Sequence, residues 1–282
     1  MYLLFDIGGT KTRIAFSSDG TSFEAPVKLE TPVDFSVAMQ AYKTEGDKIV
    51  NGRPIHAVAA GVKFLNKERN GMLAQALLPM WANQPLKQSL SEMFQVPAYL
   101  ENDTAIVGLG EAAYGAARGY GIVVYMTIST GVGGVRIIDG AIERSAQGFE
   151  PGHSIIQYAE RDIRCLSCGV AGDLESYISG RAFERRFGKK PYDVTDPAIW
   201  DEAATVLAAA LANVSVFWSP ECIVVGGSMM KHPGISLDAV RTKLPQFLRI
   251  FPQPPELKPE ALGDDGGLYG ALAFVVKQHA RL

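Results

Sequence analysis

The segment Asp6 to Thr12 (DIGGTKT) brings an acidic side chain, two glycines, hydroxyls and a cation together. Glycines let the backbone approach a phosphate closely, and the turn N–H groups and a threonine can donate hydrogen bonds to it. The lysine or Arg13 can add positive charge, and the aspartate can hold Mg²⁺ through water. The other interpretation is a hairpin turn in which glycine supplies a positive φ. A P-loop is excluded, because that motif needs glycine directly before its lysine. The candidate phosphate-binding residues are Asp6, Gly8, Gly9, Thr10 and Lys11.

A second glycine-rich segment, Thr127 to Gly134 (TISTGVGG), supplies hydroxyl donors without bulk. It lacks the GxGxxG spacing and a following helix pattern, which disfavours a dinucleotide fold. A hairpin turn is again the alternative, but two such turns in matching places suggest a clamp around polyphosphate. A third segment, Ile223 to Ser228 (IVVGGS), offers bare backbone to a flat base, or else is a tight strand-to-helix turn. The candidate residues in these two segments are Thr130, Gly131, Gly133, Gly226 and Gly227.

Glu101, Asn102 and Asp103 lie where a short strand should meet a helix. A carboxylate at such a junction is often only an N-cap. The functional interpretation is that Asp103 accepts a hydroxyl proton as phosphate is transferred. The helix N-terminus would keep it ionised with a pKa near 4, so that its role would be mainly to orient the hydroxyl.

A fourth group of residues has metal-ligand chemistry. One histidine, two cysteines in a CxxC spacing and one aspartate, which are His153, Cys165, Cys168 and Asp173, could form a tetrahedral zinc site. The alternative is a pair of ordinary thiols in a loop. Glu150 and Glu175 nearby could accept hydrogen bonds from sugar hydroxyls, or could be solvated surface charges.

These residues need strands and helices to position them. The N-terminal part predicts a strand, a glycine turn and a second strand, and the pattern is repeated from Ile122 to Ile138. Alternating strands and helices in two similar halves indicate an α/β protein with two domains. The further predicted strands are Phe23–Leu29, Ile55–Val62, Ala98–Leu100 and Cys222–Val225. The predicted helices are Asp34–Tyr42, Leu86–Phe94, Thr104–Tyr114, Asp201–Trp218, Asp238–Leu244 and Gly267–Gln278, with a helical region opening at Glu175 and with Asp264 and Asp265 capping the last helix.

Composition limits the classes of protein. The chain has 282 residues, of which 47% are hydrophobic and 20% charged, as in globular proteins. A formal net charge of −3 argues against a broad nucleic-acid-binding face, and 3 cysteines argue against a disulfide framework. The most apolar stretch, Ala203 to Trp218, is too short and too polar for a membrane span. The N-terminus makes a poor signal peptide. We therefore expect a soluble cytoplasmic protein.

In this order the motifs resemble the ROK family of sugar kinases and sugar-responsive regulators, within the actin-like ATPase superfamily. The resemblance covers nearly the whole chain, and the ordered set is highly specific although each motif is weak. It rests on DIGGTKT at the start, END at 101–103, TISTGVGGV at 127–135, EPGH at 150–153, LESYISG at 174–180, IVVGGS at 223–228 and LGDDGGLYGAL at 262–272.

The resemblance implies two actin-like (ribonuclease H-like) α/β domains, 1–117 and 118–266, with a cleft between them and the C-terminal helix 267–282 packed on the first. ATP with Mg²⁺ would lie in the cleft, its phosphates between the two glycine turns and its adenosine near Gly226 and Gly227. Asp103 matches the family's catalytic base. The positions that match sugar-binding residues are Asn102, Glu150, His153 and Glu175. The product would be a hexose 6-phosphate, and members are commonly homodimers.

One departure concerns the family's zinc motif, which usually has CxCG and a third cysteine two residues before the glutamate. Here Leu166 occupies the place of the first cysteine, Cys165 is shifted by one, and Asp173 stands where the third would be. Because aspartate can ligate zinc, a harder and weaker site remains conceivable. The alternative is loss of the metal.

The leading hypothesis is an ATP-dependent hexose kinase acting on glucose, with N-acetylglucosamine or N-acetylmannosamine as alternative substrates. Residues 61–70 (GVKFLNKERN) lack the Gly-Pro-rich composition that relatives often have in their sugar loop. A sugar-sensing regulator is a second hypothesis. Its DNA-binding segment would precede the first glycine turn, where Asp6 leaves no room. A binding module without turnover is a third, which Asp103 and both glycine turns disfavour.

Overall fold

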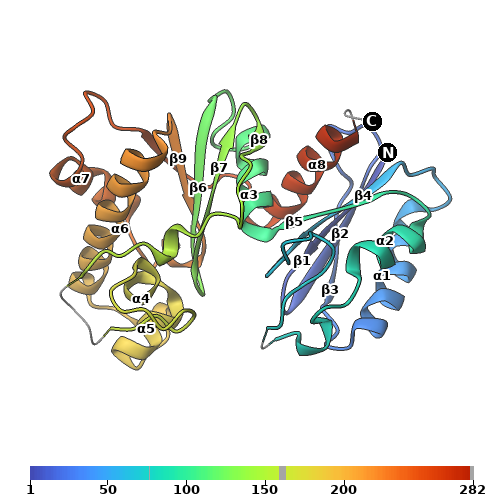
Figure 1. The fold of residues 1–282 in the computed structure, drawn as a ribbon, viewed down its shortest axis with the longest axis horizontal. Helices are drawn as coiled ribbons and strands as arrows, with labels where there is room; N and C mark the ends of the chain where they lie inside the picture. Colours follow the sequence, from blue (N-terminus) through green and yellow to red (C-terminus); the bar gives the residue numbers. More distant parts are fainter. Residues whose placement is uncertain (76, 159–162, 280–282) are drawn as a thin grey trace. The chain divides into compact units, whose positions relative to one another are not determined.

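The computed structural model describes residues 1–75, 77–158 and 163–279. The chain forms two compact units, each with its own sheet and helices (Figure 1). Unit 1 comprises Met1–Tyr114 and Leu262–Leu282, and unit 2 comprises Gly115–Ala261. The sequence had predicted the boundaries at residues 117/118 and 266/267.

The sheet of unit 1 has five strands in the order β3-β2-β1-β4-β5. Strands β1 and β2 form an antiparallel hairpin around the first glycine turn, and β3 extends it. Strands β4 and β5 run parallel to β1, so that the carboxyl ends of β1, β4 and β5 lie at one edge of the sheet. The strands are β1 (Tyr2–Ile7), β2 (Lys11–Ser17), β3 (Val27–Glu30), β4 (Ala57–Val62) and β5 (Ala98–Asn102).

Helices cover both faces of this sheet (Figure 1). Helices α1 (Phe35–Val50) and α2 (Leu86–Phe94) pack on the face formed by Leu3, Phe5 and Ile7. Helices α3 (Asp103–Ala113) and α8 (Gly266–His279) lie on the opposite face, around Leu4. Because both faces are buried, β1 and β4 are apolar at nearly every position.

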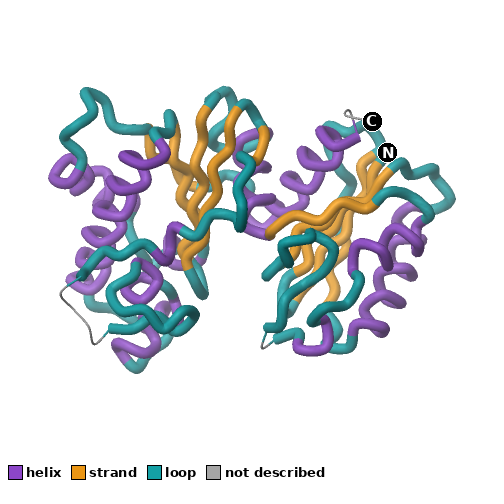
Figure 2. The backbone as a smooth tube through the Cα atoms, viewed as in Figure 1, coloured by secondary structure: helices purple, strands orange, loops and turns teal. Residues whose placement is uncertain are grey.

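Unit 2 repeats the plan with a sheet in the order β10-β9-β6-β7-β8. Figure 2 draws the strands in orange and the helices in purple. The second glycine turn joins the antiparallel pair β6 and β7, and β9 runs parallel to β6. Helix α6 provides most of the helical side of its core. The strands are β6 (Ile122–Ile128), β7 (Val132–Ile138), β8 (Ala141–Ile142), β9 (Cys222–Gly226) and β10 (Glu256–Pro259). The helices are α4 (Leu174–Ile178), α5 (Gly180–Phe187), α6 (Pro197–Trp218) and α7 (Leu237–Phe247).

Several expected elements differ from the structure. Helix α1 extends to Val50, well beyond the predicted end at Tyr42, because Gly46 is accommodated against the ring of Phe94 and does not end the helix. The strands β8 and β10 were not predicted. The predicted N-cap by Asp264 and Asp265 is wrong: these residues form a 3-10 turn leading into α8, and the Asp264 carboxylate binds Arg13 instead.

Helix α6 also corrects an expectation. At 22 residues it is the one helix within the described ranges that is long and apolar enough to cross a membrane, whereas the sequence stretch was judged too short. The most apolar 18-residue stretch of this helix is 56% buried inside the protein, as expected for a helix of the core.

Helices α3 and α8 touch at their backbones, where glycines face one another. A β-carbon on Gly270 would lie 1.8 Å from the carbonyl oxygen of Ile106, and one on Gly110 would lie 2.7 Å from that of Gly266. The obstacles are backbone atoms, which cannot rotate away. Glycine is therefore required here for close helix packing, and this contact fixes the start of α3, where Asp103 lies.

We predict that Gly270→Ala destabilises unit 1 by about 2 kcal/mol or more, because the two helices must separate. The comparison variant is Gly46→Ala in α1, whose β-carbon would meet the side chain of Phe94 at 2.6 Å. That ring can move, so we expect a loss below about 1 kcal/mol. Chemical denaturation of both variants measures the difference, and equal losses would contradict the proposed backbone contact.

Candidate functional site

The first glycine turn is held by hydrogen bonds that leave its tip exposed. The N–H of Gly8 donates to the carbonyl of Lys11 at 2.9 Å, and the Thr31 hydroxyl donates to the carbonyl of Gly8 at 2.8 Å. Neither Gly8 nor Gly9 has a left-handed φ, so the interpretation that glycine supplies a positive φ is wrong. A β-carbon on residue 8 would instead lie 2.9 Å from the carbonyl oxygen of Lys11, and one on residue 9 would lie 2.7 Å from the side chain of Leu77. Thr10 and Lys11 are exposed.

Asp6 lies at the end of β1 in a compact charged cluster. Arg13 donates from Nη1 to Asp6 at 3.3 Å and from Nη2 to Asp264 at 2.8 Å. The Asp6 carboxylate also packs against Gly267, whose β-carbon would lie 2.6 Å from it. Burial raises the pKa of Asp6 to about 6, because the attraction of Arg13 offsets desolvation only in part and Asp103 adds repulsion.

Asp103 is the first residue of α3. The N-cap is Asn102, whose Oδ1 accepts a hydrogen bond from Ala105 N at 3.2 Å, which leaves Asp103 outside the capping role. Oδ1 of Asp103 accepts the N–H of Thr104 at 2.8 Å. Burial raises the pKa of Asp103, and Lys63 and the Thr104 N–H oppose this shift only in part. The expectation of an ordinary pKa is therefore wrong: desolvation outweighs the helix N-terminus, and Asp103 is a stronger base than predicted.

The segment after β4 packs beside Asp103. Strand register pairs Val62 with Asn102, which places Lys63 next to Asp103. Arg69 forms an ion pair with Glu101, whose side chain is 4% exposed. The sequence analysis assigned no role to either basic residue, and no local pattern links Arg69 to a glutamate 32 positions away.

Residues of α4 and α5 hold the second glycine turn in place through hydrogen bonds. The N–H of Val132 donates to Oε2 of Glu175 at 2.9 Å, and the N–H of Gly180 donates to the carbonyl of Ser129 at 2.7 Å. The Ser129 hydroxyl lies 3.0 Å from that of Ser228, so the turn adjoins the segment after β9. Thr130 is exposed at its tip, with Gly131 and Gly133 half-buried beside it.

The two glycines after β9 have different tasks. Gly227 has a φ of 99°, and its β-carbon would lie 2.3 Å from the carbonyl oxygen of Ile128. A β-carbon on Gly226 would lie 1.9 Å from a carboxylate oxygen of Glu260. That carboxylate also accepts a hydrogen bond from Tyr125 at 3.1 Å. The expectation of bare backbone at Gly226 is therefore wrong, because the glycine makes room for Glu260.

His153, Cys165, Cys168 and Asp173 come together, with ligand atoms within 4.8 Å of one another. Cys165 Sγ lies 3.7 Å from His153 Nδ1, and Cys168 Sγ lies 3.5 Å from Asp173 Oδ2. Ligand atoms around tetrahedral zinc are about 3.3–3.8 Å apart, given bonds of about 2.0–2.3 Å. The separation of His153 Nδ1 from Asp173 Oδ2 is shorter, at 2.8 Å, which is a hydrogen-bond distance. The donor set fits a single zinc ion.

The local backbone also suits a metal loop. The N–H of Ser167 points at Cys165 Sγ at 3.3 Å, and Gly169 follows the second cysteine with a φ of 76°. Asp173 Oδ1 caps α4 by accepting the N–H of Ser176, so that Oδ2 is the oxygen facing the cluster. Desolvation raises the pKa of Asp173, but hydrogen bonds from His153 and Cys165 outweigh desolvation, and the pKa is lowered. Burial raises the pKa of Cys165 to about 12.

The sugar-binding candidates divide into several environments. Asn102 is half-buried at the α3 cap. Glu150 is exposed, and its carbonyl accepts the N–H of His153 across a 3-10 turn, Pro151–His153. The His153 side chain is 29% exposed, with Nδ1 in the metal cluster. Glu175 is 8% exposed, and its carboxylate is hydrogen-bonded within unit 2.

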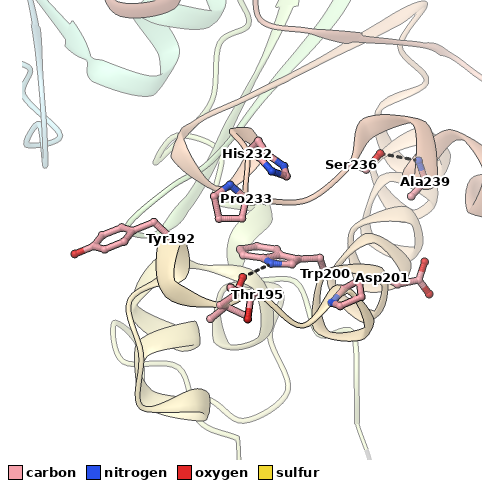
Figure 3. A pocket seen from close by; sticks show the side chains of 11 residues that line it. Tyr192, Thr195, Trp200, Asp201, His232, Pro233, Ser236 and Ala239 are labelled. Atoms are coloured by element: carbon pink, nitrogen blue, oxygen red, sulfur yellow. Dashed lines mark hydrogen bonds between the residues drawn. The ribbon is translucent and has the colours of Figure 1, made fainter.

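A hollow of about 610 Å³ lies in unit 2, where α6 and α7 begin (Figure 3). Trp200 lies at its centre with Nε1 donating to the carbonyl of Val194, and Tyr192 and His232 stand at its rim. Helix α7 begins beside it, and its N-cap Ser236 accepts the N–H of Ala239 through the side-chain hydroxyl. None of the predicted site residues lines this hollow.

Comparisons with known proteins agree on one family. The model of the ROK family matches residues 2–278. A putative fructokinase from Bacillus subtilis is 29% identical over 69% of this chain and 68% of its own. An N-acetyl-D-glucosamine kinase from Escherichia coli is 27% identical over 96% of this chain and 98% of its own.

Two solved structures show the same fold. A ROK hexokinase from Thermus thermophilus superposes with a TM-score of 0.84 at 25% identity, covering 98% of this chain and 99% of its own. A ROK family glucokinase from Streptomyces griseus, in complex with glucose and AMPPNP, has a TM-score of 0.76 at 25% identity, with the same coverage. The predicted actin-like α/β fold is confirmed.

The raised pKa of Asp6 predicts a pH-dependent stability. The unfolded chain ionises Asp6 near pH 3.8 and the folded chain near pH 6, so stability falls as pH rises between these values. Asp6→Asn should be up to about 3 kcal/mol more stable than the wild type above pH 6 and about equal to it near pH 3.5. Denaturation from pH 3.5 to pH 8 measures this. The control is Asp34→Asn. Asp34 is the N-cap of α1 and asparagine can cap the same helix, so this substitution should change stability little. A loss of stability at every pH would contradict the prediction.

Proposed function

The chain belongs to the ROK family, and on that premise we propose that it transfers the γ-phosphate of ATP to the 6-hydroxyl of a hexose, with glucose as the first substrate to test. The observation that carries the proposal is Asp103, a desolvated carboxylate at the first residue of α3 with its pKa raised. N-acetylglucosamine and N-acetylmannosamine are the alternative acceptors, since relatives include an N-acetyl-D-glucosamine kinase.

Asp103 would accept the proton of the sugar hydroxyl as the phosphate is transferred. Its raised pKa makes it a better proton acceptor than an ordinary aspartate, and the Thr104 N–H holds one oxygen in place. The amide of Asn102, whose oxygen caps α3, can donate from its nitrogen to the same sugar. Glu150 and the second nitrogen of His153 would bind further hydroxyls.

The two glycine turns would hold the phosphates. Exposed Thr10, Lys11 and Thr130 can donate to phosphate oxygens without displacing a buried partner. The carboxylate oxygens of Asp6 are hard donors of the kind that Mg²⁺ takes, through water. When bound, Mg²⁺ neutralises charge on the phosphates. We propose that the adenosine lies near Gly227.

We further propose a cytoplasmic homodimer that binds neither nucleic acid nor membranes. A formal net charge of −3 supports the first exclusion, and the burial of more than half of the most apolar stretch of α6 supports the second.

Asp103→Asn tests the catalytic assignment. The amide keeps the oxygen that accepts the Thr104 N–H but cannot take up a proton, so we expect kcat to fall by roughly 10²- to 10⁴-fold while the hexose still binds. ADP release over a hexose panel measures turnover, and calorimetry measures sugar binding. Asp196→Asn, which keeps the cap of α6, is the control. Near-normal turnover in Asp103→Asn would remove this residue from its role.

We propose that one zinc ion is held by His153, Cys165, Cys168 and Asp173, and that it fixes the ring of His153 toward the sugar. Because burial raises the pKa of Cys165, the metal must displace a proton, so binding should weaken at lower pH. We expect one equivalent of zinc in the purified protein. Asp173→Asn keeps an oxygen for the cap of α4 but removes the anionic ligand, and Cys168→Ser removes a thiolate.

Both variants should lose zinc, as measured by elemental analysis, and should lose the thiolate-to-metal absorption of the cobalt-substituted protein. Cys222→Ala is the control, since Cys222 lies in β9 outside the cluster. Full zinc content in both ligand variants would contradict the assignment.

A further inference from the structure

Three side chains, Tyr42, Thr12 and Thr31, form a buried hydroxyl chain that leads to the first glycine turn. Oη of Tyr42, on α1, lies 2.7 Å from Oγ1 of Thr12, in β2. Oγ1 of Thr12 lies 2.9 Å from Oγ1 of Thr31, which follows β3 and donates to the carbonyl of Gly8 at 2.8 Å. Thr12 and Tyr42 are fully buried, and Thr31 is 7% exposed. The hydroxyl chain therefore connects α1 to the turn through the interior of unit 1.

The direction of each hydrogen bond in the hydroxyl chain follows from the number of hydrogens. A hydroxyl carries one hydrogen, and a carbonyl oxygen can only accept. The carbonyl of Gly8 takes the hydrogen of Thr31, which leaves the Thr31 oxygen to accept from Thr12. The hydrogen of Thr12 is then used, so its oxygen accepts from Tyr42. Burial raises the pKa of Tyr42, which keeps this hydroxyl protonated and able to donate.

Thr31 fixes the orientation of two peptide groups in the first glycine turn. Its hydroxyl donates to the carbonyl of Gly8, and its backbone N–H donates to the carbonyl of Thr10 at 3.0 Å. In a trans peptide, the carbonyl and the N–H of the next residue point in opposite directions. The N–H groups of Gly9 and Lys11 are therefore directed away from Thr31. Backbone N–H groups in such turns are donors that suit phosphate oxygens.

Both ends of the hydroxyl chain are held by their neighbours. The carbonyl of Pro32, directly after Thr31, accepts a hydrogen bond from Nε1 of Trp81 at 3.0 Å. The centroid of the Tyr42 ring lies 5.4 Å from that of Phe5 and 6.2 Å from that of Trp81. A buried network in which each hydrogen has an acceptor is rigid, and its hydroxyls polarise one another. The hydroxyl chain can therefore hold the turn in one conformation before any ligand binds.

We propose that the hydroxyl chain consists of positioning residues, which hold the N–H groups of Gly9 and Lys11 in place for the phosphates of ATP. The inference rests on the proposed function for the identity of the anion. The three side chains act through the backbone of the turn. It follows that breaking the hydroxyl chain weakens the binding of phosphate groups and preserves the binding of adenosine alone. The loss should be greatest at Thr31, which contacts the turn, and smallest at Tyr42.

The first test compares Thr31→Val with Thr31→Ser. Valine replaces the hydroxyl with a methyl group, so that the carbonyl of Gly8 loses its donor, and we expect the Kd of a non-hydrolysable ATP analogue to rise about 10-fold. Serine keeps the hydroxyl and should stay within about twofold of the wild type. Calorimetry measures the affinities for the analogue and for adenosine, and the latter should not change. An unchanged affinity for the analogue in Thr31→Val, or an equal loss of affinity for adenosine, would overturn the proposal.

The second test is Tyr42→Phe, at the far end of the hydroxyl chain. This variant keeps the aromatic ring and removes the first donor, while the hydrogen bond from Thr31 to Gly8 remains. We therefore expect a smaller rise in the Kd of the analogue, of about two- to threefold. Thr44→Val removes an exposed hydroxyl from the same helix, and this control should behave as the wild type. A larger loss in Tyr42→Phe than in Thr31→Val would contradict the proposed order.

Hydrogen exchange provides a readout that needs no nucleotide. The N–H of Gly8 donates to the carbonyl of Lys11, and a loosened turn should protect this N–H less. We expect faster exchange in peptides containing residues 8–11 in Thr31→Val than in the wild type or in Thr31→Ser. Equal exchange in all three proteins would overturn the inference. A wild type that bound ATP but phosphorylated no hexose would overturn the proposed function alone, because nucleotide affinity and exchange would still test the hydroxyl chain.

Discussion

Among the residues that the structure describes, three carboxylates pack directly against a glycine, in space that a β-carbon would fill. Asp6 lies against Gly267, Glu175 against Gly131 and Glu260 against Gly226. A buried carboxylate needs hydrogen-bond donors or a cation close by. Glycine permits this approach, because it removes the atom that would hold the carboxylate away from the backbone. The glycines of these motifs therefore serve internal acidic groups as well as any phosphate.

Burial of acidic groups has an electrostatic consequence in unit 1. Desolvation raises the pKa of both Asp6 and Asp103, and repulsion from Asp103 raises that of Asp6 further. Arg13 and Lys63 offset this only in part. A carboxylate with a raised pKa is a stronger proton acceptor and is more costly to keep ionised in the folded protein. The same desolvation thus makes Asp103 a better proton acceptor and lowers the stability of the folded protein at neutral pH.

Apolar patterning was enough to predict the elements that form the two cores. The boundaries of α2 agree with the structure because Pro85 precedes it and Pro97 follows it. Those of β6 and β9 agree within one residue because each is a dense apolar run with a clear break after it. The pattern could not reveal β8, which has two residues, or β10, an edge strand that contains proline. Such strands are defined by pairing with a neighbour and not by their own composition.

The candidate site residues could be predicted from local sequence, but their distant partners could not. The glycine turns and Asp103 stand out by residue type at a strand end, which is a local signal. The partners that set their properties are distant in sequence: Arg69 reaches Glu101, Glu260 reaches Gly226, and Glu175 reaches Val132. No spacing rule connects such pairs, because they depend on how strands and helices pack. The expected pKa of Asp103 was wrong for this reason, since burial is a tertiary property.

Asp173 shows how one carboxylate can belong to a candidate metal cluster and cap a helix at the same time. A carboxylate has two oxygens, and here Oδ1 caps α4 while Oδ2 faces His153 and Cys168. A thiolate has one sulfur and is a poor hydrogen-bond acceptor, so it could ligate a metal but would cap the helix weakly. Aspartate therefore ties the cluster to the helix that carries Glu175. A cysteine at this position would make the donor set softer and better matched to zinc, but it would lose the helix cap.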